Sequence, residues 1–178
     1  MPIHQLYDTL LGLMRMGAAT PFRNRYDTLG PVIDRVFDLS TVLRTSVGMR
    51  WGALGGPAQQ ALHDAFRRFT IATYVANFDK FEGERFEISP TPRPSGADQI
   101  VQSRIVRSTG DPVRLDYVMR QAGGGWRVVD VLLDGTISRV AVQRSDFRGL
   151  LEHGDATALI ARLQRKAADL SGGSILDS

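Results

Sequence analysis

Apolar residues recur every three or four positions through the first half of the chain, which is the spacing of one helix face. This pattern predicts four helices, over residues 3–16, from Thr20-Pro21 onward, over 39–47, and from Gly55-Gly56-Pro57 to about residue 80. Thr20 is expected to cap the second helix, and Asp38 the third. Pro31 should break or restart the second helix, and Gly48 should end the third.

After Gly83 the spacing changes to the alternation of β-strands. Four strands are predicted, over residues 85–88, 100–107, 113–120 and 126–133. The proline-rich segment 90–96 should be a loop, and the glycines at 123–125 a tight turn. Because the turns between the last three strands are short, we expect a four-stranded antiparallel meander.

The last part of the chain is helical again. Ser138 should cap a helix that runs to about His153, and Asp155 should cap a final helix over residues 156–170. The order of helices, then strands, then helices indicates an α+β fold without βαβ units. We expect one domain over residues 1–171 and a disordered tail over 172–178.

One face of the predicted sheet is strongly apolar. The alternation places Val129, Val131 and Leu133 on the same face, with Trp126 and Val128 on the other around Asp130. Aromatic residues on the long helix are expected opposite this face. A dry core and a ligand cavity would both produce this pattern, so periodicity alone leaves the two open.

Composition narrows the classes of function. The net charge is +3, and all but two of the 22 basic residues are arginines, scattered among acids. This favours an arginine-rich solvated surface over a nucleic-acid site, with weak affinity for anionic membranes as an alternative. The absence of cysteine excludes disulfides and thiol catalysis. No apolar run approaches the ~18 residues of a membrane helix.

Catalytic and metal motifs are missing. His4, His63 and His153 fall on three separate predicted helices, so no metal site and no catalytic residue is expected. Asp130 lies among apolar strand residues and has two interpretations. It is either an outward carboxylate paired with Arg114 or Arg120, or a buried general acid/base.

A series of short motifs occurs in one order along the chain. It comprises Phe37-Asp38-Leu39, Gly48 with Trp51, Phe66-Arg67 before Tyr74, Phe81-Glu82-Gly83-Glu84, Asp116-Tyr117, Gly125-Trp126 with Val129-Asp130-Val131, Gly135 with Ser138, and Arg144-Ser145 with Phe147. This series, which covers roughly residues 7–170, resembles the MlaC family, the toluene-tolerance auxiliary component of a phospholipid ABC transport system.

Further stretches resemble the hopanoid-biosynthesis-associated HpnM branch of that family. They are Ser46-Val47-Gly48, Tyr117-Val118-Met119-Arg120, Val131-Leu132, residues 134–141 and residues 143–147. Members of the MlaC family in general tend to carry Glu-Gly-Val-Ser where this chain has Asp134-Gly135-Thr136-Ile137-Ser138. This departure adds hopanoid-type lipids to phospholipids as the expected cargo.

The resemblance implies an NTF2-like fold, in which helices and a curved sheet enclose a cavity for a lipid tail. It implies a periplasmic carrier whose signal peptide is absent from the printed sequence. The implied partners are an inner-membrane ABC transporter complex and an outer-membrane lipoprotein complex, or an RND-type hopanoid exporter, with transient membrane contact. No enzymatic activity and no cofactor is implied; a bound lipid is the cargo.

The resemblance and the apolar pattern together select candidate lipid-binding residues. These are Leu43, Val47, Trp51, Phe69, Tyr74, Phe78, Leu115, Tyr117, Met119, Val129, Val131, Leu133, Val140 and Phe147. Two other functions remain open from the sequence. One is a small enzyme with Asp130 as its acid/base, and the other is a scaffold of a transporter complex that binds no lipid.

Overall fold

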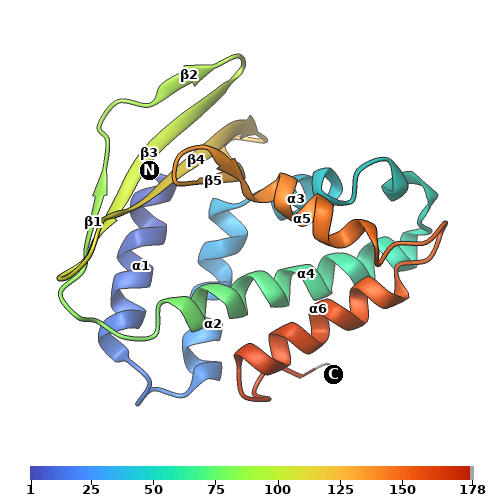
Figure 1. Cartoon of the computed structure of the whole chain (residues 1–178), viewed down its shortest axis with the longest axis horizontal. Helices are drawn as coiled ribbons and strands as arrows, with labels where there is room; N and C mark the ends of the chain where they lie inside the picture. The colour runs from blue at the N-terminus through green and yellow to red at the C-terminus, as the bar shows by residue number, and fades with distance from the viewer. Residues whose placement is uncertain (177–178) are drawn as a thin grey trace.

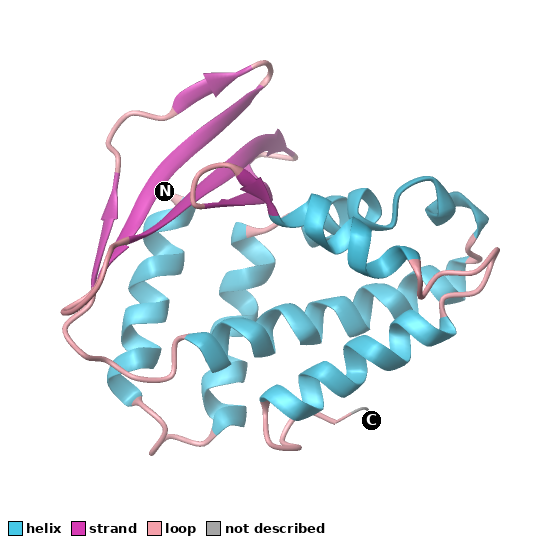
Figure 2. Cartoon of the chain, viewed as in Figure 1, coloured by secondary structure: helices cyan, strands magenta, loops and turns pink. Residues whose placement is uncertain are grey.

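An antiparallel sheet and a layer of helices on one of its faces make up the protein (Figures 1 and 2). The computed structural model describes residues 1–176. The helices are α1 (Pro2–Met16), α2 (Phe22–Val36), α3 (Leu39–Val47), α4 (Gly56–Asn77), α5 (Arg139–Arg148) and α6 (Thr157–Leu170), with a 3-10 helix η1 (Gly48–Ala53). The strands are β1 (Arg85–Ile88), β2 (Arg93–Ser95), β3 (Asp98–Val106), β4 (Val113–Ala122), β5 (Gly125–Leu133) and β6 (Ile137–Ser138).

The helices of the first half follow the apolar periodicity, and capping side chains and prolines explain some of their ends. The Asp38 carboxylate accepts a hydrogen bond from the Thr41 amide at 3.1 Å and caps α3 as predicted. The prediction that Thr20 caps α2 is wrong, because α2 begins at Phe22 after Pro21 and has no side-chain cap. Pro31 lies within α2, which continues through it instead of breaking. No helix in residues 1–176 meets the length and hydropathy needed to cross a bilayer.

The sheet has more strands than the four predicted, with the order β1-β3-β4-β5-β6 and β2 beside β3. Strand β2 lies in the segment expected to be a loop. It pairs with the start of β3 near β1, and its Pro94 is tolerated at this edge because an outer strand need not donate every N–H. Strand β6 has two residues, which is too short to leave an alternation in the sequence.

A β-bulge changes which residues of β5 face the helices. The register shifts between Val118 and Met119, so Val128 pairs with Met119 while Val131 pairs with Tyr117. Val128 and Val131 therefore both belong to the core cluster, which does not include Val129. The predicted grouping of Val129 with Val131 is wrong, because an extra residue in one strand reverses the alternation beyond it.

The outer face of the sheet is polar but includes one fully buried carboxylate. Asp116 is 0% exposed and forms a two-pronged ion pair with the Arg114 guanidinium, at 3.2 and 2.9 Å. Arg114 in turn lies over Gly135, where a Cβ atom would come within 2.6 Å of the arginine Nε. Gly135 also has φ of +76° in the turn before β6. A side chain there would therefore both strain the turn and displace Arg114.

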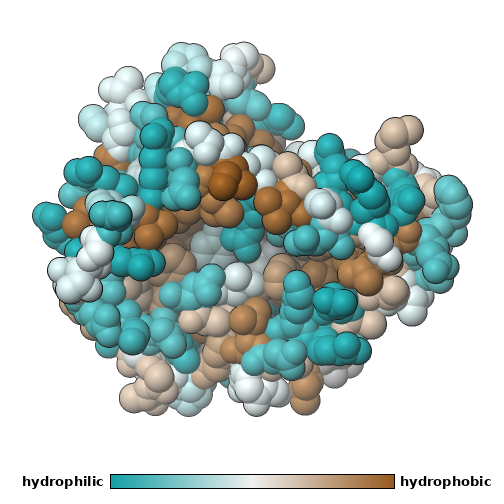
Figure 3. Space-filling model, viewed as in Figure 1, coloured by the Kyte–Doolittle hydropathy of each residue, from teal (hydrophilic) through white to brown (hydrophobic). Residues whose placement is uncertain are grey.

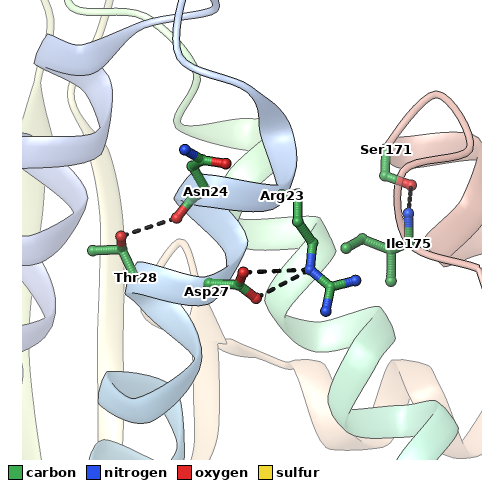
Figure 4. A network of polar contacts seen from close by, with 6 residues as sticks. All are labelled: Arg23, Asn24, Asp27, Thr28, Ser171 and Ile175. Atoms are coloured by element: carbon green, nitrogen blue, oxygen red, sulfur yellow. Dashed lines mark hydrogen bonds and ion pairs between the residues drawn. The ribbon is translucent and has the colours of Figure 1, made fainter.

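The C-terminal helices differ from expectation at their ends. Helix α5 is capped by Ser138, whose Oγ accepts from the Ala141 amide at 3.0 Å, but it ends at Arg148 and not near His153. After α6, residues 171–176 turn back toward α2. Ile175 is 3% exposed, and its amide donates to Ser171 Oγ at 3.0 Å (Figure 4). The part of the expected disordered tail over 177–178 lies outside the described residues.

Helix α2 presents Arg23 to this turn, and Arg23 Nε donates to Asp27 at 3.2 Å (Figure 4). Thr28 Oγ1 donates to the Asn24 backbone carbonyl at 2.9 Å on the other side of the helix. In Figure 4 Ile175 is directed toward Arg23 of α2. The chain end is therefore ordered as far as 176 by packing against a helix that is distant in sequence.

Candidate functional site

Three neighbouring hollow spaces are lined by the helices and by strands of the sheet. One is a small pocket of about 30 Å³, and the other two are clefts of about 560 and 670 Å³. Ligand pockets generally measure roughly 300–1,000 Å³, so each cleft has the size of a ligand site while the pocket has room only for water. Figure 3 shows a hollow between the sheet and helix α4, with apolar and polar residues at its edge.

The small pocket lies beneath the centre of β5. Its walls are mostly apolar and come from α3, α4, α5 and the sheet: Phe37, Leu39, Val42, Phe66, Thr70, Tyr74, Val128, Asp130, Val131, Arg139, Val140 and Gln143.

The sheet cleft, of about 560 Å³, lies where the C-terminal ends of α1 and α4 meet strands β3, β4 and β5. Its apolar wall is formed by Met14, Tyr74, Phe78, Ile105, Val113, Leu115, Val131 and Leu133. Its polar rim is formed by Asp79, Lys80, Glu82, Glu84, Arg107 and Arg139, with Thr73, Asn77, Ser108 and Thr109 nearby. The stacked rings of Tyr74 and Phe78, 6.1 Å apart, form the side nearest the helix.

The helix cleft, of about 670 Å³, lies between α4, α5 and α6 and reaches the end of β5. Its wall consists of Phe69, Leu133, Val142, Phe147, Gly149, Leu150, Leu159 and Leu163, and its polar residues are Arg139, Gln143, Asp146, Arg162 and Lys166. The Lys166 ammonium lies 5.7 Å from the centre of the Phe69 ring.

A few side chains separate these spaces from one another. Leu133 lines both clefts, while Tyr74 and Val131 line the pocket and the sheet cleft. Arg139, the first residue of α5, lines all three. The three spaces are therefore neighbours that share these side chains as parts of their walls.

The structure brings together eight of the fourteen candidate lipid-binding residues around these spaces: Phe69, Tyr74, Phe78, Leu115, Val131, Leu133, Val140 and Phe147. The other six do not line them: Leu43, Val47, Trp51, Tyr117, Met119 and Val129. Leu43, Val47 and Met119 are instead buried in the core cluster. Sequence reasoning missed Arg139, since one more arginine in an arginine-rich chain carries no distinguishing signal.

Tyr117 has a structural task that its sequence position did not reveal. Its hydroxyl lies 2.8 Å from the hydroxyl of Tyr7, which lies 2.6 Å from Ser103 Oγ. Ser103 donates its only proton to the Leu115 carbonyl, at 2.6 Å. Tyr7 therefore donates to Ser103 and accepts from Tyr117, and this chain of hydrogen bonds fastens α1 to the middle of the sheet.

This hydrogen-bond chain predicts a loss of stability at high pH. Burial raises the pKa of Tyr7 to about 12 and raises the pKa of Tyr117 well above its usual value. The unfolded tyrosines titrate near ~10, so stability is complete below about pH 10 and declines as pH rises toward 12, by roughly 2–3 kcal/mol for Tyr7 alone. Tyr7→Phe should flatten this decline, measured by urea unfolding across that range; an unchanged slope would contradict the assignment.

Asp130 adopts neither of the roles that the sequence left open. Its oxygens accept hydrogen bonds from Ser138 Oγ at 2.5 Å, the Val140 amide at 3.1 Å and its own neighbour's amide at 2.8 Å. The expected pairing with Arg114 or Arg120 is wrong, because these pair with Asp116 and Asp98. Asp130 thus fastens the start of α5, including Arg139, to β5.

The three histidines lie apart from one another in the part of the chain that the structure describes. His4 lies on α1 and His63 on α4, while His153 lies in the turn after α5 and not on a helix as expected. Within residues 1–176 no three His, Cys, Asp or Glu side chains come together as metal ligands would. Each cleft has an apolar wall with charged residues at its rim, of both signs around the sheet cleft and mostly cationic around the helix cleft.

Comparisons with known proteins agree with this geometry. Residues 4–165 match the model of the family described as "MlaC protein". Among solved structures, a phospholipid-binding protein from Ralstonia solanacearum, in complex with a phospholipid, superimposes with a TM-score of 0.80. The two sequences are 20% identical, over 96% of this chain and 97% of the other, so this similarity establishes the fold. A search of curated proteins found no match.

Proposed function

The chain belongs to the MlaC family of periplasmic, non-enzymatic lipid carriers, and on this premise we propose that its cargo is a phospholipid with its tails in the two clefts. The observation that carries the proposal is the pair of apolar-walled clefts that meet at Leu133. The relative from Ralstonia solanacearum, described with a bound phospholipid, shares this fold.

The physical demand on such a carrier matches these walls. Each methylene of a lipid tail costs about 0.8 kcal/mol in water, so a tail of about 16 carbons costs roughly 13 kcal/mol. The aromatic and aliphatic residues of the clefts offset this cost by surrounding the tail. No bond is made or broken, because the tail passes from one apolar environment to another.

The candidate residues that line the three spaces are the proposed tail contacts: Phe69, Tyr74, Phe78, Leu115, Val131, Leu133, Val140 and Phe147. Tyr74 and Leu133 occupy the boundaries between spaces, so a tail that passes from one space to the next must contact them. The core residues Leu43, Val47, Tyr117 and Met119 then support the walls from behind.

A hopanoid is the second candidate cargo, favoured by the HpnM-like residues 134–141 at the start of α5. Its rigid ring system would need one broad cavity, and its uncharged body would leave the cations of the rim without a partner. We propose the corresponding partners in each case. A phospholipid carrier would exchange cargo with an inner-membrane ABC transporter complex and an outer-membrane lipoprotein complex, and a hopanoid carrier with an RND-type exporter.

Lipid extraction tests the proposed cargo. We expect protein purified without detergent from the periplasm of its host to release phospholipid into organic solvent, in a near-stoichiometric amount by mass spectrometry. A hopanoid in place of phospholipid would overturn the cargo in favour of the second candidate. Protein that carries no lipid, and takes none from phospholipid vesicles, would overturn the proposal itself.

A further inference from the structure

We propose that the phosphate of an anionic lipid headgroup binds at the mouth of the helix cleft, between Arg139 of α5 and the Arg162 and Lys166 side chains of α6. This inference rests on the proposed function and makes it more specific. It places the headgroup at one of the two cleft mouths. It also gives Arg139 a role in recognition of the lipid.

Arg139 is a cation without a counter-charge at the point where the three spaces meet. Its guanidinium lies 6.0 Å from the centre of the Tyr74 ring, and among residues 1–176 it has no carboxylate within ion-pair distance. Other arginines that border the sheet, such as Arg114 and Arg120, are paired with aspartates. A guanidinium held at an apolar cavity without such a partner is suited to bind a phosphate, which it contacts through two parallel N–H donors.

The position of Arg139 is fixed by the sheet and not by a flexible loop. The amides of Val140 and Ala141 donate to Asp130 and Ser138, respectively, which anchors the first turn of α5. Because these amides already have acceptors, the side chain of Arg139, and not the helix N-terminus, is the donor left for a ligand.

The charges of the two mouths differ, and this difference selects one of them. The rim of the helix cleft has the cations Arg139, Arg162 and Lys166 and a single carboxylate, Asp146. The rim of the sheet cleft has as many acids as bases: Asp79, Glu82 and Glu84 against Lys80, Arg107 and Arg139. Lys80 is moreover paired with Glu82, at 3.1 Å. An anion is therefore attracted to the helix cleft and gains little at the other mouth.

The cations of α6 are placed as an amphiphilic ligand requires. Arg162 and Lys166 are exposed and one turn apart, so they share a face of the helix. The Lys166 ammonium lies above the Phe69 ring, so a charged group stands at the edge of the apolar wall. A phosphate at this edge leaves the attached tails directed past Leu133 toward the sheet cleft.

Matched lipids with and without a phosphate test this assignment. Binding of acyl-labelled phosphatidylglycerol and of diacylglycerol with the same chains would be measured for lipid-free wild type, Arg139→Gln, the double variant R162Q/K166Q and the control Arg165→Gln. Arg165 is exposed on α6 and lines neither cleft, so its replacement makes an equal charge change on the same helix.

Arg139→Gln should weaken phosphatidylglycerol binding about tenfold, as expected for loss of a charge-assisted hydrogen bond, and diacylglycerol binding by less than about twofold. R162Q/K166Q should weaken phosphatidylglycerol binding several-fold. Arg162 and Lys166 are exposed, so their replacement should leave the protein folded. Circular dichroism would verify that Arg139→Gln and the double variant are folded. Arg165→Gln should behave as wild type.

Other results would overturn the assignment. Equal losses for both lipids in Arg139→Gln would show that Arg139 only supports the wall, and an unchanged affinity for phosphatidylglycerol in R139Q and in the double variant would exclude the site. Millimolar inorganic phosphate that stabilises lipid-free wild type, but not Arg139→Gln, would reassign the site to free phosphate. Wild type that binds neither lipid would instead refute the proposed function, so the two failures are distinguishable.

Discussion

Replacing Leu133 by Asp should abolish lipid binding while the domain stays folded. Leu133 is only partly buried and forms a wall of both clefts, so a tail that passes between them must contact it. A carboxylate there would have to lose its water when the tail arrives, which costs several kcal/mol without a compensating partner. We expect the affinity for phosphatidylglycerol to fall at least ~100-fold, in equilibrium with vesicles.

A matched change on the opposite face of the sheet serves as the control. Val106 is also partly buried on a strand, but it lies next to Arg85 of β1 and lines neither cleft. Val106→Asp introduces the same charge with an arginine to receive it, so lipid binding should remain near that of wild type. If Leu133→Asp retains lipid, or if both variants lose it equally, the clefts are not the path of the tail.

Phe66→Ala should cost about 3–5 kcal/mol of unfolding free energy in the lipid-free protein, which is the usual range for a buried aromatic. Phe66 is 1% exposed, contacts Phe147 edge to face at 6.3 Å and forms part of the wall of the small pocket. Its loss should enlarge that pocket toward the volume of a tail segment. Bound lipid should then return part of the stability, because a ligand that binds only the folded state stabilises it.

The measurement is urea unfolding of the variant with and without lipid, compared with a core position away from the clefts. Leu10 of α1 is fully buried and lines none of the three spaces. Leu10→Ala should cost about 2–5 kcal/mol. Its gain in stability on adding lipid should equal that of wild type. An equal gain for Phe66→Ala would show that the small pocket does not accept a tail.

Most helices and strands could be predicted from the sequence because its strongest patterns are local. The apolar stripe of α1, the Asp38 cap of α3 and the glycine turn between β4 and β5 all act over a few residues, and each appears in the structure as expected. Where it failed, the cause was a weak or absent local pattern. Strand β6 has only two residues, and β2 is held in place by its pairing with β3.

The bulge in β5 shows why the site was harder to predict than the elements. The sequence contains the run from Val128 to Leu133, but nothing in it marks which residue is the extra one. That choice depends on pairing with β4, and it brings Val128 into the core cluster that Val129 does not join. The same limit applies to Tyr117, whose partner Tyr7 lies far away along the chain.

The sequence by itself therefore determined the α+β class, the apolar character of one sheet face and, through its ordered motifs, the family of lipid carriers. Only the tertiary structure decided which apolar residues line a space and which fill the core. It also placed Arg139 where three spaces meet, with no carboxylate partner among residues 1–176. The physical reason is that periodicity tells which side of an element avoids water. Whether that side meets another side chain or an open space is set by how distant elements pack.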